Sequence, residues 1–202
     1  MVLCRPLAAI ALSSSQRELI RADVACWVKY WKNLSIGPAG DERGERDTVA
    51  NVLANAPAFR NLLYYRLSHG PSERMQVLVP LLRRVWRPER ELRFSPGSLG
   101  PGCFIMHGWG TVVLAKSIGA NFVVGPNVSI GYDGAGKCPT VGDNVSIYVG
   151  AIVIGDISIG DDVAVGAGAL VARNVPDGVT VVGLPARPVA LTRTPGIDPP
   201  TL

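Results

Sequence analysis

The stretch 141-VGDNVSIYVGAIVIGDISIGDDVAVGAGALV-171 repeats a six-residue pattern without a slip. An aliphatic side chain occupies every sixth position, in the series Val141, Ile147, Val153, Ile159, Val165 and Val171. A period of six fits neither an amphipathic helix nor a single alternating strand, and it is typical of a repeated strand-and-turn unit. The sequence therefore predicts a parallel β-helix, whose triangular coils contain roughly eighteen residues and stack about 4.8 Å apart.

The repeat extends toward the N-terminus with two interruptions. Its earlier aliphatic members are Leu99, Ile105, Val112, Ile118, Val124 and Ile130. The step from Ile130 to Val141 is eleven residues, so about five residues are predicted to loop out of the coil. The step from Ile105 to Val112 is seven residues, and the extra residue falls in a segment that contains His107. Breaks in a rigid scaffold are common places for functional residues.

Ahead of the repeat the sequence predicts helices. Residues 16–33 carry apolar side chains at helical spacing, and further helices are predicted at about 47–68, with a break near Pro57, and at about 72–86. The N-terminal 1-MVLCRPLAAIALSSS is a poor match to a signal peptide and is predicted to be an irregular start.

These patterns predict a mostly β protein with a small helical N-terminal domain at residues 1–90. A β-helix follows at 91–188, and a disordered tail is predicted at 189–202 because it is rich in proline.

Composition favours one compact protein of the cytoplasm. Hydrophobic residues make up 48% of the 202 residues, but no stretch has the roughly eighteen consecutive apolar residues of a membrane span. The four cysteines lack paired spacing, so reduced thiols are expected. The net charge of +4 and the basic cluster 82-LRRVWRPERELR-93 come without a nucleic-acid-binding motif, so no nucleic-acid partner is expected.

Three segments are similar to the serine O-acetyltransferase family of hexapeptide-repeat acyltransferases. The segment 99-LGPGCFIMHGWGTVV-113 resembles the family's IGxGxxIDHATGxVI, 130-IGYDGAGKCPTVGDNV-145 resembles its LGGTGK…RHPKIGDGV loop, and 183-GLPARPV-189 resembles its GVPARIV. The resemblance covers roughly residues 55–190. It implies a left-handed β-helix, a homotrimer, acetyl-CoA as acyl-donor co-substrate with no permanently bound cofactor, and a small hydroxyl acceptor.

The chemistry that the resemblance implies requires a general base. An alcohol must lose its proton as it attacks a thioester carbonyl, and a neutral imidazole suits that role near neutral pH. The chain has two histidines, and His69 ends a predicted helix, where histidine commonly complements the helix dipole. His107 lies in the break of the repeat and matches the family's catalytic histidine. His107 is therefore predicted to be the base.

Several residues depart from the family pattern. Met106 stands where the family has an aspartate before its catalytic histidine. Leu92 stands where a second aspartate orients the imidazole, so the neighbouring Glu91 is predicted to take that catalytic role, with a solvated surface charge as the alternative. Lys137 and Cys138 replace the arginine and histidine that help to hold serine. With these changes a sugar hydroxyl competes with serine as the predicted acceptor.

The resemblance also places the other contacts. The residues predicted to contact the acceptor are Met106, Trp109, Asp133, Lys137 and Cys138. Those predicted to line the groove for the donor are Val149, Gly150, Ala167 and Gly168, with Arg173 and Arg187 at the CoA phosphates. Asp133 followed by glycine is also an ordinary turn signal.

Two other functional classes compete with acetyl transfer as predictions for this fold. A zinc hydratase on this fold needs three histidines around the metal, and the chain has two, so no metal site is expected. A non-catalytic trimeric scaffold or partner-binding protein with a drifted site remains the alternative, because fold alone does not establish activity. The chain ends in Leu202 rather than the family's C-terminal isoleucine, so docking to cysteine synthase is not expected.

Overall fold

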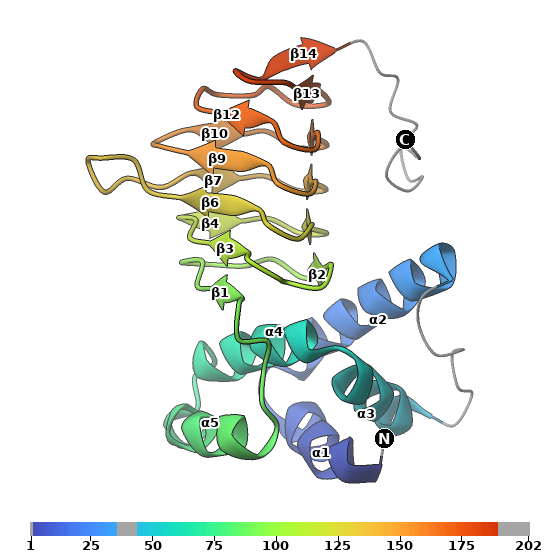
Figure 1. Ribbon diagram of the computed structural model, residues 1–202. Helices are drawn as coiled ribbons and strands as arrows, with labels where there is room; N and C mark the ends of the chain where they lie inside the picture. Colours follow the sequence, from blue (N-terminus) through green and yellow to red (C-terminus); the bar gives the residue numbers. More distant parts are fainter. Residues whose placement is uncertain (1, 36–43, 190–202) are drawn as a thin grey trace.

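The computed structural model describes residues 2–35 and 44–189, in which helices precede a parallel β-helix (Figure 1). The helical elements are a 3₁₀ turn η1 (Val2–Cys4), α1 (Arg5–Ser13), α2 (Arg17–Leu34), α3 (Glu45–Asn55), α4 (Pro57–Ser68) and α5 (Glu73–Val85). None of the described helices is both long and apolar enough to cross a membrane. The C-terminal residues 190–202 lie outside the described residues, so the predicted tail is described only at Val189.

The helices follow the sequence prediction except at the N-terminus. Helices α2, α3, α4 and α5 lie where helices were predicted, and Ala56 separates α3 from α4 just before Pro57. The prediction of an irregular start was wrong, because residues 5–13 form α1 and bury Leu7, Ala8 and Ala11 in the core. A proline in the first turn suits a helix start, since its missing N–H would have no partner there.

The β-helix consists of short strands in three sheets (Figure 1). Sheet A contains β1 (Arg93–Phe94), β3 (Val112–Val113), β6 (Ser129–Gly131), β9 (Ile152–Ile154) and β12 (Leu170–Val171). Sheet B contains β4 (Ser117–Ile118), β7 (Thr140–Val141) and β10 (Ser158–Ile159). Sheet C contains β2 (Phe104–Ile105), β5 (Val123–Val124), β8 (Ser146–Ile147), β11 (Ala164–Val165), β13 (Thr180–Val182) and the antiparallel β14 (Arg187–Val189).

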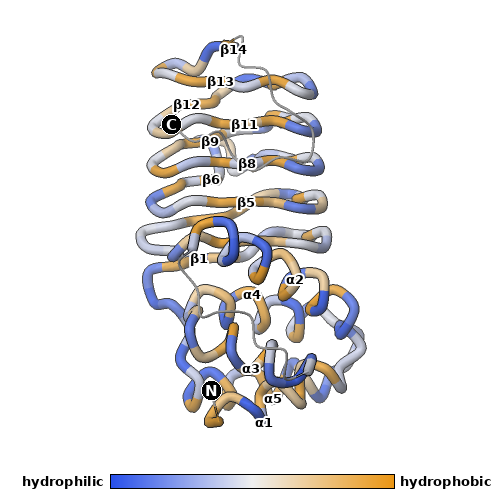
Figure 2. Tube along the Cα trace, turned by 90° about the vertical axis from the view of Figure 1, so that its right-hand side faces the viewer, coloured by the Kyte–Doolittle hydropathy of each residue, from blue (hydrophilic) through white to orange (hydrophobic). Residues whose placement is uncertain are grey.

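The strand register confirms the repeat and its larger break. Thr140 pairs with Ser158, eighteen residues later, whereas Ser129 pairs with Ile152, twenty-three residues later. The five additional residues are those predicted to loop out, and the loop between β6 and β7 projects from the prism (Figure 1). Aliphatic residues occupy equivalent positions in successive coils, as Ile130, Val153 and Val171 do in sheet A, and apolar and polar residues alternate along the tube in Figure 2.

The inward position near the first break differs from the prediction by one residue. Val113 is fully buried, whereas the predicted Val112 is half-buried. The cause is the wide turn between β2 and β3, in which His107, Gly108 and Gly110 all have positive φ. This turn absorbs more chain than a regular corner, so the inward aliphatic residue shifts to Val113.

The turns between the sheets form three edges of the prism. The turns from sheet C to sheet A, at 106–111, 125–128, 148–151 and 166–169, make the His107 edge. The turns from sheet A to sheet B, at 114–116, 132–139, 155–157 and 172–174, make the loop edge. The turns from sheet B to sheet C, at 119–122, 142–145 and 160–163, make the aspartate edge.

A ladder of carboxylates fastens the coils together along the aspartate edge. Asp143 Oδ1 accepts a hydrogen bond from the backbone N–H of Ala120 at 2.7 Å, and Asp161 Oδ1 accepts one from the N–H of Asp143 at 2.7 Å. Asp177 Oδ1 accepts the N–H of Asp161 at 2.9 Å. Each carboxylate thus accepts a hydrogen bond from a backbone N–H of the coil before it. The residue that precedes this N–H is a glycine in each case (Gly119, Gly142 and Gly160), because a Cβ there would collide with the carboxylate.

We expect Gly142→Ala to lower the free energy of unfolding by about 1–3 kcal/mol, the usual cost of overpacking. A Cβ at Gly142 would collide with Asp161 Oδ1 and lie 2.8 Å from the carbonyl carbon of Gly160. Urea unfolding followed by circular dichroism measures the change. Gly134→Ala is the matched control, since a Cβ at Gly134 meets nothing within 4 Å. Equal stability of the two variants would contradict the prediction.

A buried ion pair joins the helices to the first coil. Arg66 of α4 donates to Asp23 of α2 through Nε at 2.9 Å and Nη2 at 3.1 Å, and the two side chains are 3% and 1% exposed. Arg66 also donates to the carbonyl oxygens of Leu99 and Gly100, at 2.7 and 2.6 Å. Asp23 Oδ1 accepts the backbone N–H groups of residues 102 and 103. Burial raises the pKa of the Asp23 carboxyl, and the hydrogen bonds and charge of Arg66 oppose that shift.

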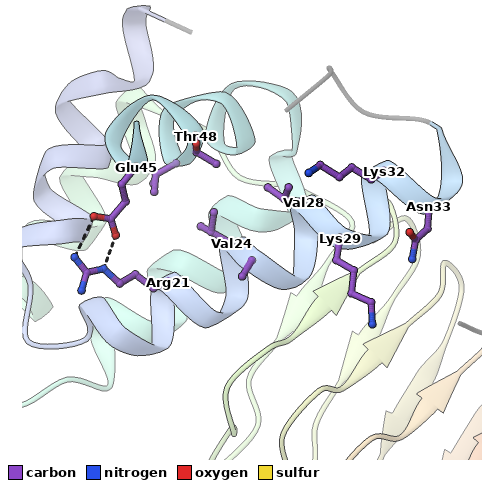
Figure 3. Close-up of a pocket in the computed structure, with 10 residues that line it drawn as sticks. Arg21, Val24, Val28, Lys29, Lys32, Asn33, Glu45 and Thr48 are labelled. Atoms are coloured by element: carbon purple, nitrogen blue, oxygen red, sulfur yellow. Dashed lines mark hydrogen bonds and ion pairs between the residues drawn. The ribbon is translucent and has the colours of Figure 1, made fainter. Parts of the chain in front are cut away.

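A second ion pair in the helical part is exposed to solvent, in contrast to the buried Asp23–Arg66 pair. Arg21 of α2 and Glu45 of α3 form an ion pair and line a cavity of about 670 Å³ between these helices (Figure 3). Their side chains are 43% and 47% exposed. Water solvates both groups, so this pair contributes far less to stability than the Asp23–Arg66 pair.

Candidate active site

The turn that contains His107 is strained and tightly packed against the helices. His107 has φ of 64°, in the left-handed region that non-glycine residues rarely adopt, and Gly108 follows with φ of 77°. The N–H of Gly108 donates to the carbonyl oxygen of Met106 at 2.8 Å. A Cβ on Gly108 would lie 3.1 Å from Leu92 Cδ2 and 3.3 Å from Ala58 Cβ. Contacts with α4 and with the chain before β1 therefore fix this turn.

The imidazole of His107 lies at the surface against an aromatic ring. It stacks on Trp109, with ring centroids 4.5 Å apart and an interplanar angle of 15°. His107 is exposed, and Trp109 is 52% exposed. Within residues 2–35 and 44–189, neither ring nitrogen of His107 forms a hydrogen bond. Both nitrogens are thus open to a ligand, while Trp109 restricts the rotation of the ring.

Glu91 does not contact His107 within the described part of the chain. Its exposed side chain lines a separate cavity together with His69. The neighbouring Leu92 is the residue that packs against the His107 turn, and it is buried. The orienting role of Glu91 stays a prediction, and Trp109 is the side chain that holds the imidazole here.

Four of the residues predicted to bind the donor lie above His107 on the same edge. The N–H of Asn127 donates to the carbonyl oxygen of Trp109 at 2.7 Å, which joins the His107 turn to the next coil. In the coils above, the N–H of Gly150 donates to Pro126 at 3.0 Å, and that of Gly168 to Val149 at 2.9 Å. Val149, Gly150, Ala167 and Gly168 therefore continue a column that begins at Trp109. Ala167 and Gly168 are exposed, and Val149 is 47% exposed.

The looped-out segment lies at the loop edge, where its own contacts order it. Asp133 Oδ1 accepts the N–H groups of Lys137 and Ala135 at 3.0 and 2.9 Å, and these hydrogen bonds lower the pKa of its carboxyl. Lys137 Nζ donates to Asp156 at 2.9 Å, and this hydrogen bond raises the pKa of the ammonium. Cys138 is half-buried beside them. The side chain of Asp133 thus stabilises a turn, which agrees with the turn signal of Asp133 followed by glycine in the sequence.

One chain does not bring all of the predicted residues together. Met106, His107 and Trp109 share an edge with the donor column, whereas the loop that holds Lys137 and Cys138 is on a different edge. Arg173 lies on the loop edge as well, and Arg187 lies in β14.

Sequence reasoning missed two features of this region. It assigned no partner within the chain to Lys137, although Asp156 lies directly after Gly155 in the regular hexapeptide 153–158. It also gave Trp109 only a substrate contact and not a position against the histidine. The two residues are only two positions apart in the sequence, which was the available signal for a contact. Their rings stack because the backbone at His107 adopts a left-handed conformation, which this spacing does not predict.

Comparison with known proteins places the chain among serine acetyltransferases. No protein-family model matches the chain. Serine acetyltransferase from Helicobacter pylori (strain J99) is 35% identical over 148 residues, which cover 70% of this chain and 86% of that protein. The enzyme from Synechococcus elongatus is 37% identical over 153 residues, which cover 71% of this chain and 63% of that protein. The chain thus spans less than two thirds of the length of that relative.

Solved structures agree with these relatives. Soybean serine acetyltransferase matches with a TM-score of 0.63 at 27% identity, over 90% of this chain and 72% of that one. The Neisseria gonorrhoeae enzyme matches with a TM-score of 0.64 at 25% identity, over 92% of this chain and 70% of that one. These matches confirm the left-handed β-helix and the family predicted from the sequence. The chain belongs to the serine acetyltransferase family.

Proposed function

We propose that this protein is an acetyl-CoA-dependent O-acetyltransferase in which His107 is the general base. The observation that carries the proposal is the arrangement of the His107 edge. An exposed imidazole with both nitrogens open lies at the foot of a column of small residues. The names of the relatives and a soybean serine acetyltransferase structure with bound serine, at 27% identity, support the same class of reaction.

The proposed reaction transfers the acetyl group in one addition and one elimination. A nitrogen of His107 takes the proton of the acceptor hydroxyl as its oxygen attacks the thioester carbonyl carbon. The carbon–sulfur bond then breaks, and the proton passes from the imidazole to the departing thiolate. The products are an acetyl ester and free CoA. Trp109 keeps the imidazole plane fixed during both proton transfers, with ring centroids 4.5 Å apart.

The donor would lie along the column of the His107 edge. From Trp109 to Gly168 the column rises by three coils, or roughly 14 Å at the usual strand spacing. Gly150 and Gly168, both with positive φ, leave this wall free of bulky side chains. Val149 narrows it, because its side chain is 47% exposed there. Arg173 and Arg187 remain the proposed contacts of the CoA phosphates, and both are exposed.

A homotrimer would complete the site. Lys137 and Cys138 lie at the loop edge of one chain, and they reach a histidine only if that edge meets the His107 edge of a neighbouring copy. Exposed apolar side chains on sheet A and both edges support such packing: Trp109, Tyr132, Val149 and Ile152 are 52%, 55%, 47% and 40% exposed. Exposed apolar surface of this kind is typical of subunit interfaces.

Two acceptors are proposed, L-serine first and a sugar second. The relatives support serine. The sugar is favoured by Met106, Cys138 and the pairing of Lys137 with Asp156, because a zwitterion bound here would find few free charged partners. A neutral hydroxyl compound needs no such partners.

The test of the proposal is acetyl-CoA turnover, followed as free-thiol release, with L-serine and with a panel of neutral sugars. We expect turnover on one of them. K137R/C138H, which rebuilds the arginine and histidine of the family pattern, should lower KM for serine about tenfold if serine is the acceptor, since one charge-assisted hydrogen bond contributes about that much. No turnover on any acceptor, together with no acetyl-CoA binding, would favour the non-catalytic scaffold instead.

A further inference from the structure

We propose that a second cavity, between α4, α5 and β1, binds a small anion that carries a phosphate group. The cavity measures about 420 Å³, and the side chains around it include Arg83, Arg90, Arg93, His69, Tyr65 and Glu91. We call it the arginine cavity. Its binding chemistry is independent of the proposed acetyl transfer, since none of these side chains contacts His107 within the described residues.

The charge of the arginine cavity favours an anion. Three guanidinium groups line it against the single carboxylate of Glu91. Across residues 2–35 and 44–189, none of these three arginines forms an ion pair, whereas Arg5, Arg21 and Arg66 each pair with a carboxylate. Guanidinium groups bind phosphate oxygens through two parallel hydrogen bonds, which makes clustered arginines typical of phosphate sites.

Aromatic contacts and a histidine add to these groups. His69 Nδ1 lies 2.9 Å from the carbonyl oxygen of Tyr65, which can only accept, so Nδ1 carries a hydrogen. Among the residues that the structure describes, Nε2 of His69 has no hydrogen-bond partner. The His69 ring stacks on Tyr65 with centroids 4.1 Å apart. Arg83 lies over the Tyr64 ring, 5.6 Å from its centroid. The rings restrict His69 and Arg83, so less conformational entropy is lost when they bind a ligand.

Hydrogen bonds from α4 hold the chain that carries the other two arginines. Asn61 Oδ1 accepts the N–H of Glu89 at 2.8 Å, and Asn61 Nδ2 donates to the carbonyl oxygen of Leu92 at 3.3 Å. Asn61 is 5% exposed. The N–H of Arg93 donates to Thr111 at 2.9 Å, which ties the same segment to the β-helix. The backbone around Arg90 and Arg93 is therefore fixed before any ligand binds.

The arginine cavity shares a wall with the His107 turn. Leu92 lines the cavity, and its side chain also packs beside Gly108. An occupant that moves Leu92 would thus alter the turn that presents the imidazole. The shared wall makes an effector the natural kind of ligand for this cavity.

The test is isothermal titration calorimetry of the full chain at low ionic strength with inorganic phosphate, and in a second arm with glycerol 3-phosphate. We expect saturable binding that R90Q/R93Q weakens at least tenfold and that Glu91→Gln strengthens. R84Q/R87Q is the matched control, because it removes the same charge from exposed arginines that do not line the cavity. Circular dichroism confirms that each variant is folded.

The outcomes separate the possibilities. Tighter binding of glycerol 3-phosphate than of phosphate identifies a phosphate ester as the ligand, and equal binding identifies the free oxyanion; both support the site. No saturable binding, or equal losses in R90Q/R93Q and R84Q/R87Q, overturns it. Because calorimetry needs no turnover, failure of the proposed acetyl transfer would leave this result unaffected.

Discussion

Arg66→Met is expected to lower the free energy of unfolding by about 3–5 kcal/mol, the usual cost of removing one partner from a buried ion pair. Of the donors in the described part of the chain, the substitution leaves the Asp23 carboxylate, 1% exposed, with the two backbone N–H groups of residues 102 and 103. It also leaves the carbonyl oxygens of Leu99 and Gly100 without the guanidinium. The substitution thus removes hydrogen bonds at the place where α2, α4 and the first coil meet. Urea unfolding followed by circular dichroism measures it.

Two further variants show whether the unpaired buried charge of Asp23 causes the loss of stability in Arg66→Met. D23L/R66M removes both partners, so we expect it to recover much of the stability that Arg66→Met loses, because no uncompensated charge remains buried. Glu45→Gln breaks the exposed Arg21–Glu45 pair and should cost less than about 1 kcal/mol. If Arg66→Met costs no more than Glu45→Gln, the buried pair does not have the role described here.

His107→Asn is expected to lower kcat/KM for acetyl transfer by about 10²–10⁴-fold, the usual contribution of a general base. Asparagine tolerates the left-handed backbone better than most residues do, so the turn with φ of 64° is retained while the base is lost. His107→Ala also removes the imidazole, but alanine adds strain to the left-handed backbone at this position. Free-thiol release under saturating acetyl-CoA measures both variants.

Trp109→Leu separates positioning from proton transfer. Without the stacked ring the imidazole rotates freely but keeps its nitrogens, so we expect a decrease of roughly tenfold, smaller than that for His107→Asn. Glu45→Gln, far from the turn, should retain full turnover. If His107→Asn keeps more than a tenth of the activity, the base is a different group.

The sequence predicted the β-helix well because period six has one structural explanation. The pairing of Thr140 with Ser158 and the five-residue loop followed directly from the spacing of aliphatic residues. Two local features were not predictable in this way. The left-handed turn at His107 shifts the inward residue to Val113, and α1 forms because tertiary packing buries a short apolar segment.

The candidate site was predicted only in part. His107 was predicted from the break in the repeat together with the resemblance to the family, and the donor residues were predicted from that resemblance. Glu91 was predicted because it adjoins Leu92, which stands at the family's aspartate position; in the structure Leu92 is buried and Glu91 is exposed, and the orienting role of Glu91 stays a prediction. The arginine cavity was not predicted, because it joins residues of α4, α5 and β1 that are distant in sequence.

The regular pairing of residues eighteen positions apart also limits how this protein can change length. An insertion or deletion of eighteen residues between β7 and β12 adds or removes one full coil and leaves every edge in line. A change of six residues would instead rotate everything above it by a third of a turn. If the change lay between β7 and Gly150, the wall formed by Gly150 and Gly168 would then stand over a different edge from His107. Indels that keep the hexapeptide repeat are therefore tolerated only as whole coils, whereas extra residues can loop out at an edge, as they do between β6 and β7. The distance from the histidine to the upper end of the groove can vary only in steps of about 4.8 Å.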